Sequence, residues 1–163
     1  MNKAFLSLGS NRGDRIANLN MAMAQLSEKG GNIIITSSLY ETQPWKMEDK
    51  TDFFNQVLLL ETNLSVRQLM NIIIKIEALM GRVRIEEKYE PRTIDIDILF
   101  FNDEIINTQE LSIPHSLIQE RRFVLEPLAE IAPAYIHPVF NKSSKELLAE
   151  CQDKSRIKKS VSK

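Results

Sequence analysis

The chain has 163 residues, of which 43% are hydrophobic and 26% charged, and its formal net charge at pH 7 is −1. This length supports one well-packed domain and is short for two. The apolar runs are too short for a membrane-spanning helix, and the first residues lack a signal-peptide core. We therefore expect one cytoplasmic domain over residues 1–153. The single Cys151 excludes an internal disulfide, and two histidines leave little room for a zinc site.

Charge is unevenly distributed along the chain. Residues 154–163 hold five basic residues and no acidic one, which leaves 16 basic and 22 acidic residues in 1–153. We expect this basic tail to be frayed. Within the domain, basic residues gather at 82–92 and at Arg121 and Arg122. Such local clusters favour a small anionic ligand over nucleic acid, which needs an extended basic surface.

Hydrophobic periodicity predicts the order β-α-β-β-α-β. Apolar residues alternate or cluster as in strands at 3–8, 32–41, 53–62 and 94–101, and recur at helical spacing between these strands. Asp14 is a suitable cap for the first helix, which Gly30-Gly31 ends. A capping box from Ser65 to Gln68 opens the second helix, which ends at Gly81. The polar segment 42–52 is long enough to form a lid.

This order is typical of a ferredoxin-like α+β fold. Right-handed crossovers then place both helices on one face of an antiparallel sheet. Further along, the sequence predicts an additional hairpin formed by Ile105-Ile106 and 111–115. Two C-terminal helices follow, a short one with Pro127 in its first turn and a last one from Ser143 to Glu150.

The strand that contains Asp95 and Asp97 carries the strongest functional signal. Its residues alternate, so both carboxylates point to the same side, with Cα atoms roughly 6.5 Å apart. The apolar partners Ile94, Ile96, Ile98 and Phe100 predict a central strand that faces the helices, with the aspartates on the opposite, open face. Two hard carboxylate ligands suit Mg²⁺ bound together with substrate phosphates. The alternative is an edge strand protected from aggregation by its charge.

Several short motifs together carry a resemblance to a known family. They span residues 5 to about 135: Leu8-Gly9-Ser10-Asn11, Ser38-Leu39-Tyr40-Glu41-Thr42, Phe54-Asn55, Glu77 with Gly81-Arg82-Val83-Arg84, Pro91-Arg92-Thr93-Ile94-Asp95-Ile96-Asp97, and Ile113-Pro114-His115 with Arg121-Arg122-Phe123. In these motifs the chain resembles the 6-hydroxymethyl-7,8-dihydropterin pyrophosphokinases of folate biosynthesis. The resemblance implies transfer of pyrophosphate from ATP to the pterin alcohol, with two Mg²⁺ ions, in a protein that we expect to be a monomer.

The resemblance also implies a role for each matching residue. Asp95 and Asp97 would bind both metals and act in catalysis with the mobile-loop arginines Arg82 and Arg92. The nucleotide would be contacted by Glu77, Arg84, Arg92, Ile98, His115 and Arg121. The pterin would be contacted by Thr42, Gln43, Trp45, Phe53, Asn55, Tyr89, Asp95 and Phe123. An amide such as Asn55 can donate and accept along the pterin edge, and aromatic side chains can stack on its ring.

Other interpretations stay open for some of these residues. His115 could be a satisfied hairpin histidine, and Phe53 and Phe123 could be core residues; His137 we expect to be structural. The chain departs from the family pattern at Glu90, Ile74, Glu110 and Ser116, which affects the expected affinity for ATP. A nucleotidyltransferase or glycosyltransferase that uses the D-x-D aspartates is a second enzymatic candidate. An RNA-binding ferredoxin-like module is disfavoured, because two carboxylates on the open face would repel phosphates.

Overall fold

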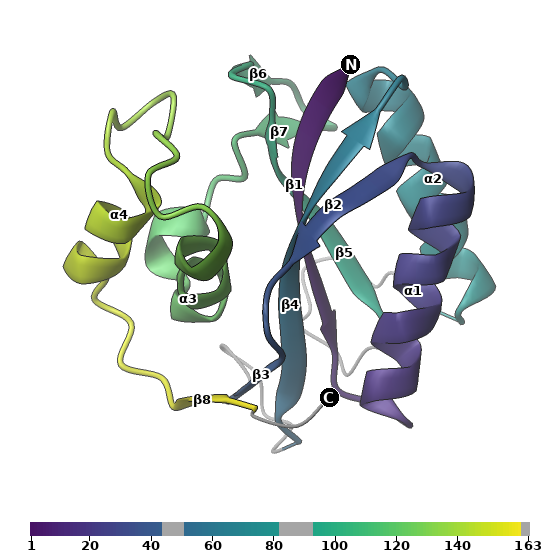
Figure 1. Cartoon of the computed structure of the whole chain (residues 1–163), viewed down its shortest axis with the longest axis horizontal. Helices are drawn as coiled ribbons and strands as arrows, with labels where there is room; N and C mark the ends of the chain where they lie inside the picture. The colour runs from purple at the N-terminus through teal and green to yellow at the C-terminus, as the bar shows by residue number, and fades with distance from the viewer. Residues whose placement is uncertain (44–50, 82–92, 161–163) are drawn as a thin grey trace.

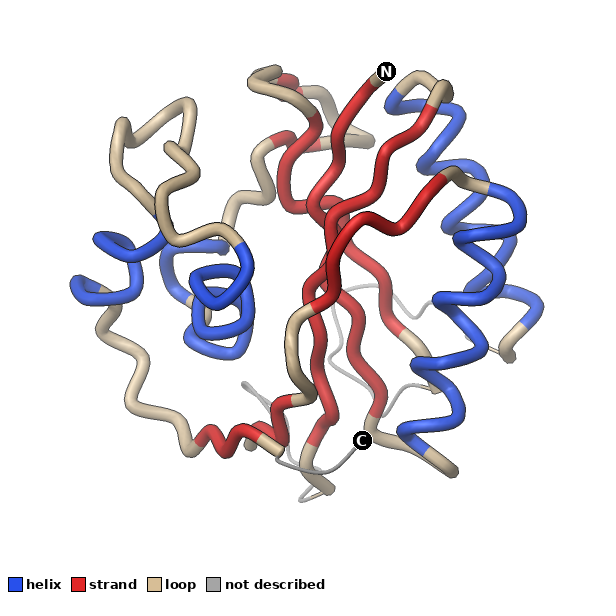
Figure 2. The backbone as a smooth tube through the Cα atoms, viewed as in Figure 1, coloured by secondary structure: helices blue, strands red, loops and turns tan. Residues whose placement is uncertain are grey.

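The computed structural model describes residues 1–43, 51–81 and 93–160. Its main sheet has six strands in the order β5-β1-β4-β3-β8, with β2 also paired to β4, and every pairing is antiparallel (Figures 1 and 2). The strands of this sheet are β1 (Asn2–Ser10), β2 (Asn32–Thr36), β3 (Tyr40–Thr42), β4 (Phe53–Thr62), β5 (Asp95–Phe101) and β8 (Ile157–Lys159). The expected hairpin is confirmed as β6 (Ile106–Asn107) and β7 (Ser112–Ile113).

The two helices expected between the strands are confirmed, together with their caps. The side chain of Asp14 accepts a hydrogen bond from Ala17 N and opens α1 (Arg15–Lys29). Ser65 and Gln68 form the predicted capping box of α2 (Val66–Leu79). Both helices pack on one face of the sheet (Figure 1) and bury their apolar sides in one core cluster. In the described ranges, no helix is both long and apolar enough to cross a membrane.

A second helical layer covers part of the opposite face, which we expected to be open. It consists of the 3₁₀ helix η1 (Ile118–Glu120), α3 (Arg122–Ile131) and α4 (Ser144–Glu150), on the other side of the sheet from α1 and α2 (Figure 2). These helices form a second core cluster with sheet residues that include Phe5, Val57 and Phe100. Asp95 stands at the opposite end of β5 from Phe100, and both Asp95 and Asp97 are half-buried.

Strand β5 differs from the prediction in two respects. Among the residues that the structure describes, it is an edge strand of the sheet, not a central one. The register with β1 also shifts between Phe5 and Leu6, so Leu99 is bulged. Ile94, Ile96 and Ile98 therefore face α1 and α2 as predicted, whereas Phe100 turns to the second cluster. There the Phe100 ring packs at 4.7 Å from the ring of Tyr135.

Two other boundaries differ because contacts distant in sequence override local pattern. The predicted strand at 32–41 is split into β2 and β3 at Ser37, whose hydroxyl accepts a hydrogen bond from Val57 N. Helix α3 starts five residues before Pro127, which lies inside it rather than in its first turn. Its first residue, Arg122, donates its backbone N–H to the carboxylate of Asp153.

The part of the basic tail that the structure describes, residues 154–160, lies along the sheet, where we expected a frayed segment; residues 161–163 lie outside the described residues. Strand β8 pairs with β3, with Thr42 opposite Ile157 and Tyr40 opposite Lys159. Ser160 N also donates to the carbonyl of Leu39. The tail thus extends the sheet at the edge far from β5, next to β3 in Figure 1.

Gly31 offers a direct test of this packing. Its φ is +156°, and a Cβ atom would lie 2.1 Å from the carbonyl oxygen of Glu61. We expect Gly31→Ala to lower the free energy of unfolding by about 3 kcal/mol or more, because backbone must move to relieve the clash. Gly13→Ala is the matched control, since Gly13 also has a positive φ but only one atom within 4 Å, at 3.9 Å. Equal decreases in the free energy of unfolding for the two variants, measured by urea denaturation, would contradict this packing.

Candidate active site

Three residues form a row across the sheet at the centre of the site. Gly9 on β1 is paired with Asp95 on β5 and with Asn55 on β4. Residues paired in this way point to the same face of a sheet, and here it is the face that α3 partly covers. Asp97 follows two residues later, opposite Ser7. The predicted shared orientation of the aspartates therefore agrees with the strand register.

Gly9 leaves the space that the Asn55 side chain occupies. A Cβ atom on Gly9 would lie 2.6 Å from Asn55 Oδ1 and 3.4 Å from the ring of Phe53. The Asn55 amide nitrogen donates to the hydroxyl of Thr42, and both residues are buried. The structure thus brings together three of the residues predicted to contact the pterin, Thr42, Phe53 and Asn55, beside Asp95.

The buried carboxylate of Glu77 holds β5 by a hydrogen bond between the two aspartates. It lies near the C-terminal end of α2, is 2% exposed, and its carboxylate accepts a hydrogen bond from Ile96 N at 3.0 Å. Ile96 stands between the two aspartates, so this bond fixes the backbone from which both project. It also satisfies an N–H group of an edge strand. The contact of Glu77 with a nucleotide stays a prediction.

The chemistry of the acidic pair fits Mg²⁺. In the parts of the chain that the structure describes, no group of three or more His, Cys, Asp or Glu residues could hold a metal ion. Asp95 and Asp97 offer two hard carboxylate ligands on one face of the sheet. Mg²⁺ commonly takes one or two protein carboxylates and completes its coordination with substrate phosphates and water, so two aspartates are a sufficient protein donor set.

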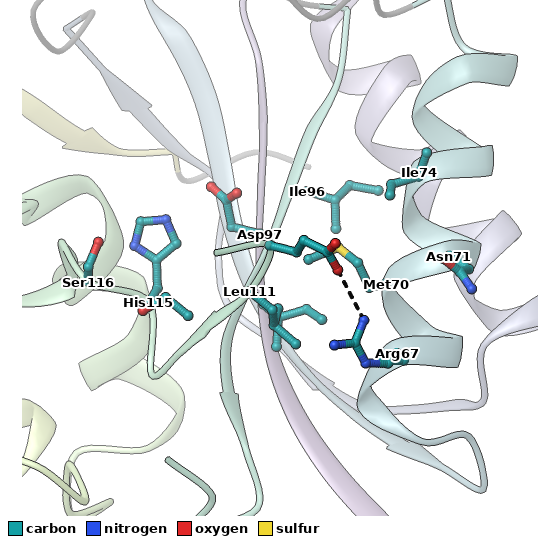
Figure 3. A pocket seen from close by; sticks show the side chains of 12 residues that line it. Arg67, Met70, Asn71, Ile74, Ile96, Asp97, Leu111, His115 and Ser116 are labelled. Carbon is teal, nitrogen blue, oxygen red and sulfur yellow. Dashed lines mark hydrogen bonds and ion pairs between the residues drawn. The ribbon is translucent and has the colours of Figure 1, made fainter. Parts of the chain in front are cut away.

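A cavity of about 580 Å³ lies along the outer edge of β5, between α2 and the segment that contains β6 and β7. Asp97, Ile98 and His115 line it, so it includes three residues predicted to bind metal or nucleotide. The Asp97 carboxylate and the His115 ring lie on one side of β5, and Ile96 and Ile74 on the other (Figure 3). The remaining lining residues are Arg67, Met70, Asn71, Glu110, Leu111, Ser112 and Ser116.

Three of the four residues at which the chain departs from the family pattern also line the cavity, namely Ile74, Glu110 and Ser116. Glu110 forms an ion pair with Arg67 at 3.2 Å, drawn as a dashed line in Figure 3. Arg67 and its neighbours on α2 were not predicted as site residues. Their signal is the helical spacing of Arg67, Asn71 and Ile74, which places them on one side of α2.

His115 is held as a neutral donor next to the aspartates. Its Nδ1 atom accepts a hydrogen bond from Leu117 N at 3.2 Å, so Nε2 carries the proton. Burial and then the charge of Arg121 lower the pKa of His115 to about 4, against the opposite effect of Asp95. The guanidinium of Arg121 also lies 5.4 Å from the ring centre of Phe123. His115, Arg121 and Phe123 are therefore neighbours, as a joint substrate site requires.

The other predicted residues have simpler outcomes. Gln43 is exposed, and its side-chain oxygen accepts a hydrogen bond from Arg156 N. His137 is 3% exposed, and its Nδ1 atom accepts from the backbone of Val139 and Phe140, which agrees with a structural role. Several predictions lie outside the described residues: Trp45, Arg82, Arg84, Tyr89, Glu90, Arg92, and most of the proposed lid segment.

Known proteins are similar to this chain over most of its length. Residues 5–133 match the family model described as 7,8-dihydro-6-hydroxymethylpterin-pyrophosphokinase (HPPK). The chain is 41% identical over 150 residues to a 2-amino-4-hydroxy-6-hydroxymethyldihydropteridine pyrophosphokinase of Aquifex aeolicus, covering 92% of each. It is 44% identical over 131 residues to that of Bacillus subtilis, covering 80% of this chain and 78% of that protein.

Other relatives are longer than this chain. A folic acid synthesis protein of Pneumocystis carinii is 42% identical over 135 residues, which are 83% of this chain and 18% of that protein. A solved structure described as HPPK-DHPS in complex with substrates matches with a TM-score of 0.75 at 18% identity, over 91% of this chain and 43% of that one. This structural match shows the fold.

The family match and the named relatives define an enzyme class, the pyrophosphokinases, which are diphosphotransferases. Within that class, the chain belongs to the 7,8-dihydro-6-hydroxymethylpterin-pyrophosphokinase family.

The neutral state of His115 can be measured directly. Because the pKa of His115 is lowered from 6.5 to about 4 in the folded state, acid protonates the unfolded chain first. The contribution of His115 to stability therefore falls as the pH drops from about 6.5 to 4, and levels off below that. We expect an imidazole pKa near 4 by NMR titration, and a smaller loss of stability between pH 7 and 5 in His115→Gln. A pKa near 6.5 would contradict this environment.

Proposed function

We propose that this protein transfers a pyrophosphoryl group from ATP to 6-hydroxymethyl-7,8-dihydropterin in folate biosynthesis. The products would be AMP and the pterin diphosphate. The observation that carries the proposal is the row Asn55, Gly9 and Asp95, in which the amide proposed to bind the pterin and the carboxylate proposed to bind the metal share one face of the sheet. The family to which the chain belongs supports the same reaction.

On the pterin side, the ring would lie beside the Asn55 amide, whose Oδ1 atom fills the space over Gly9. Asn55 is oriented by its hydrogen bond to Thr42 and would pair with the donor and acceptor groups of the pterin edge. Phe53, next to Gly9, and Phe123, at the start of α3, would contact the ring faces. The hydroxymethyl group would then point toward Asp95.

On the nucleotide side, ATP would occupy the cavity along the edge of β5. Ile96 and Ile98 provide an apolar wall, and Asp97 lies where the phosphates would meet the metal. The Nε2–H group of His115 and the guanidinium of Arg121 would donate to phosphate oxygens. The side chain of Ile74 cannot hydrogen-bond the nucleotide, and Glu110 forms an exposed ion pair with Arg67, so apolar contact and shape would contribute more of the binding at these two positions.

Asp95 and Asp97 would hold two Mg²⁺ ions. When bound, the ions would neutralise charge on the transferred phosphates and favour deprotonation of the alcohol. The hydroxymethyl oxygen would attack the β-phosphorus, the bond from that phosphorus to the α,β-bridging oxygen would break, and AMP would leave with that oxygen. The alcohol proton would pass to solvent. Arg82 and Arg92 are proposed to offset charge that develops on the phosphates.

The finer structural expectations belong to the same proposal. Two features support a ferredoxin-like core. The four strands that flank α1 and α2 in sequence have the order β5-β1-β4-β2, and both helices lie on one face of the sheet. We further propose a monomer that works in the cytoplasm, with lid segments that close over both substrates. Sedimentation of the purified chain tests the monomer.

A product assay tests the reaction. The wild-type chain, incubated with ATP, Mg²⁺ and the pterin, should form AMP and pterin diphosphate in equal amounts and stop when EDTA is added. Asp97→Asn should lower the rate by about a hundredfold or more, because a carboxylate that binds the metal is lost. Its melting temperature should change little, since Asp97 projects from the outer face of β5. Release of free pyrophosphate would instead support the nucleotidyltransferase alternative.

A second variant tests the pterin site. In Gly9→Ala the new methyl group would displace the Asn55 amide, which lies 2.6 Å from its position. We expect the KM for the pterin to rise by at least about tenfold. The KM for ATP should stay near the wild-type value, because the cavity assigned to ATP lies along β5 and is not lined by Gly9. An increase in both KM values of similar size would mean that the substitution disturbs the whole sheet.

A further inference from the structure

The C-terminal tail contacts the start of β4 and the end of β3, from which the pterin-binding residues project. Just before β8, Arg156 and Gln43 are joined by two hydrogen bonds. Gln43 N donates to the carbonyl of Arg156 at 3.1 Å, and Arg156 N donates to the side-chain oxygen of Gln43 at 3.0 Å. This pairing continues the β3–β8 ladder by one residue beyond Thr42.

The same arginine also holds Asp52. Its Nη2 atom lies 2.8 Å from each carboxylate oxygen of Asp52, across 104 residues of sequence. Asp52 immediately precedes Phe53, the first residue of β4. From the other side, Arg15 donates to the carbonyl of Asp52 at 2.7 Å. Arg156 therefore ties the end of β3 and the start of β4 to one another.

The beginning of the tail is anchored to α3. Arg122 donates its backbone N–H to Asp153 at 3.0 Å and its side chain to the carbonyl of Ser155 at 3.3 Å. Arg122 lies between Arg121 and Phe123, both predicted to contact substrates. The tail from 153 to 160 thus connects the element that carries Phe123 with the two strands that carry Thr42, Phe53 and Asn55.

The exposure of the ion pair indicates what it does. The side chain of Arg156 is 67% exposed and that of Asp52 21%, and such surface pairs contribute little to global stability. Their effect is instead local, because they restrict two chain positions that flank the predicted pterin residues. We propose that Arg156 is a positioning residue that aligns the pterin side of the active site. This inference rests on the proposed function.

The test compares pterin affinity with nucleotide affinity. In Arg156→Ala, we expect the dissociation constant of the pterin, measured by fluorescence with a non-hydrolysable ATP analogue present, to rise by about threefold to fivefold. The affinity for the analogue alone and the melting temperature should not change. Arg156→Lys should recover part of the affinity. Lys154→Ala is the matched control, since it removes an exposed cation from the same tail and should have no effect.

A double-mutant cycle identifies the partner. If Arg156 acts through Asp52, then Asp52→Ala should weaken pterin binding to a similar extent, and the double variant should be no weaker than either single one. Any of three results would overturn the proposal. Arg156→Ala could leave the pterin affinity unchanged, it could weaken the binding of both substrates equally, or the losses of pterin affinity in the two single variants could add up in the double variant. If the wild-type chain itself fails to bind the pterin, then the proposed function fails first.

Discussion

Gly9 lies on β1 between β4 and β5, and any side chain there would stand between Asn55 and Asp95. A Cβ atom added to Gly9 would lie only 2.6 Å from Asn55 Oδ1, which shows how completely the space is used. Because Gly9 carries only a hydrogen atom, the Asn55 amide can lie over β1, on the same face of the sheet as the Asp95 carboxylate of β5. The proposed pterin site depends on this arrangement.

Strand β5 divides the site into two parts. Asp95 lies beside Gly9, on the side of the pterin residues, whereas Asp97 lines the cavity on the outer edge of the strand. An edge strand suits this task, because a central strand would have a neighbour where the cavity now lies. The buried Glu77 carboxylate, bonded to Ile96 N between the aspartates, keeps that edge in place without a further strand.

Residues far from the proposed metal site hold its surroundings in place. α3 brings Arg121 and Phe123 toward the aspartates, and the tail connects α3 to β3 and β4 through Asp153, Ser155 and Arg156. The ion pair of Arg156 with Asp52 is one of these distant contacts, and we propose that it positions the pterin side of the site. The sheet has one core cluster on each face, and the proposed site lies on the face that α3 partly covers.

Local sequence patterns predicted the parts of the structure that depend on local physics. Alternation placed Asp95 and Asp97 on one face, and the caps at Asp14 and Ser65 were confirmed. Alternation could not reveal that Leu99 is bulged, which turns Phe100 to the other core. It also could not show that β5 is an edge strand, because α2 and the segment that contains β6 and β7 bury its apolar residues as completely as a central position would.

Contacts between distant residues account for the other differences. The basic residues of the tail predicted a frayed end, but β8 pairs with β3, and Arg156 forms an ion pair with Asp52. The start of α3 is likewise set by Asp153 rather than by Pro127. Within the site, the resemblance supplied the set of predicted residues, and the strand register showed that Gly9, Asn55 and Asp95 lie side by side on one face.

The most direct measurement is a crystal structure of the chain with Mg²⁺, a non-hydrolysable ATP analogue and the pterin. We expect the pterin ring beside the row of Gly9, Asn55 and Asp95, with its edge hydrogen-bonded to Asn55. We also expect metal ions bound by both Asp95 and Asp97, with the analogue in the cavity beside β5. A pterin bound away from Gly9, or a metal site that leaves out Asp97, would contradict the proposed site.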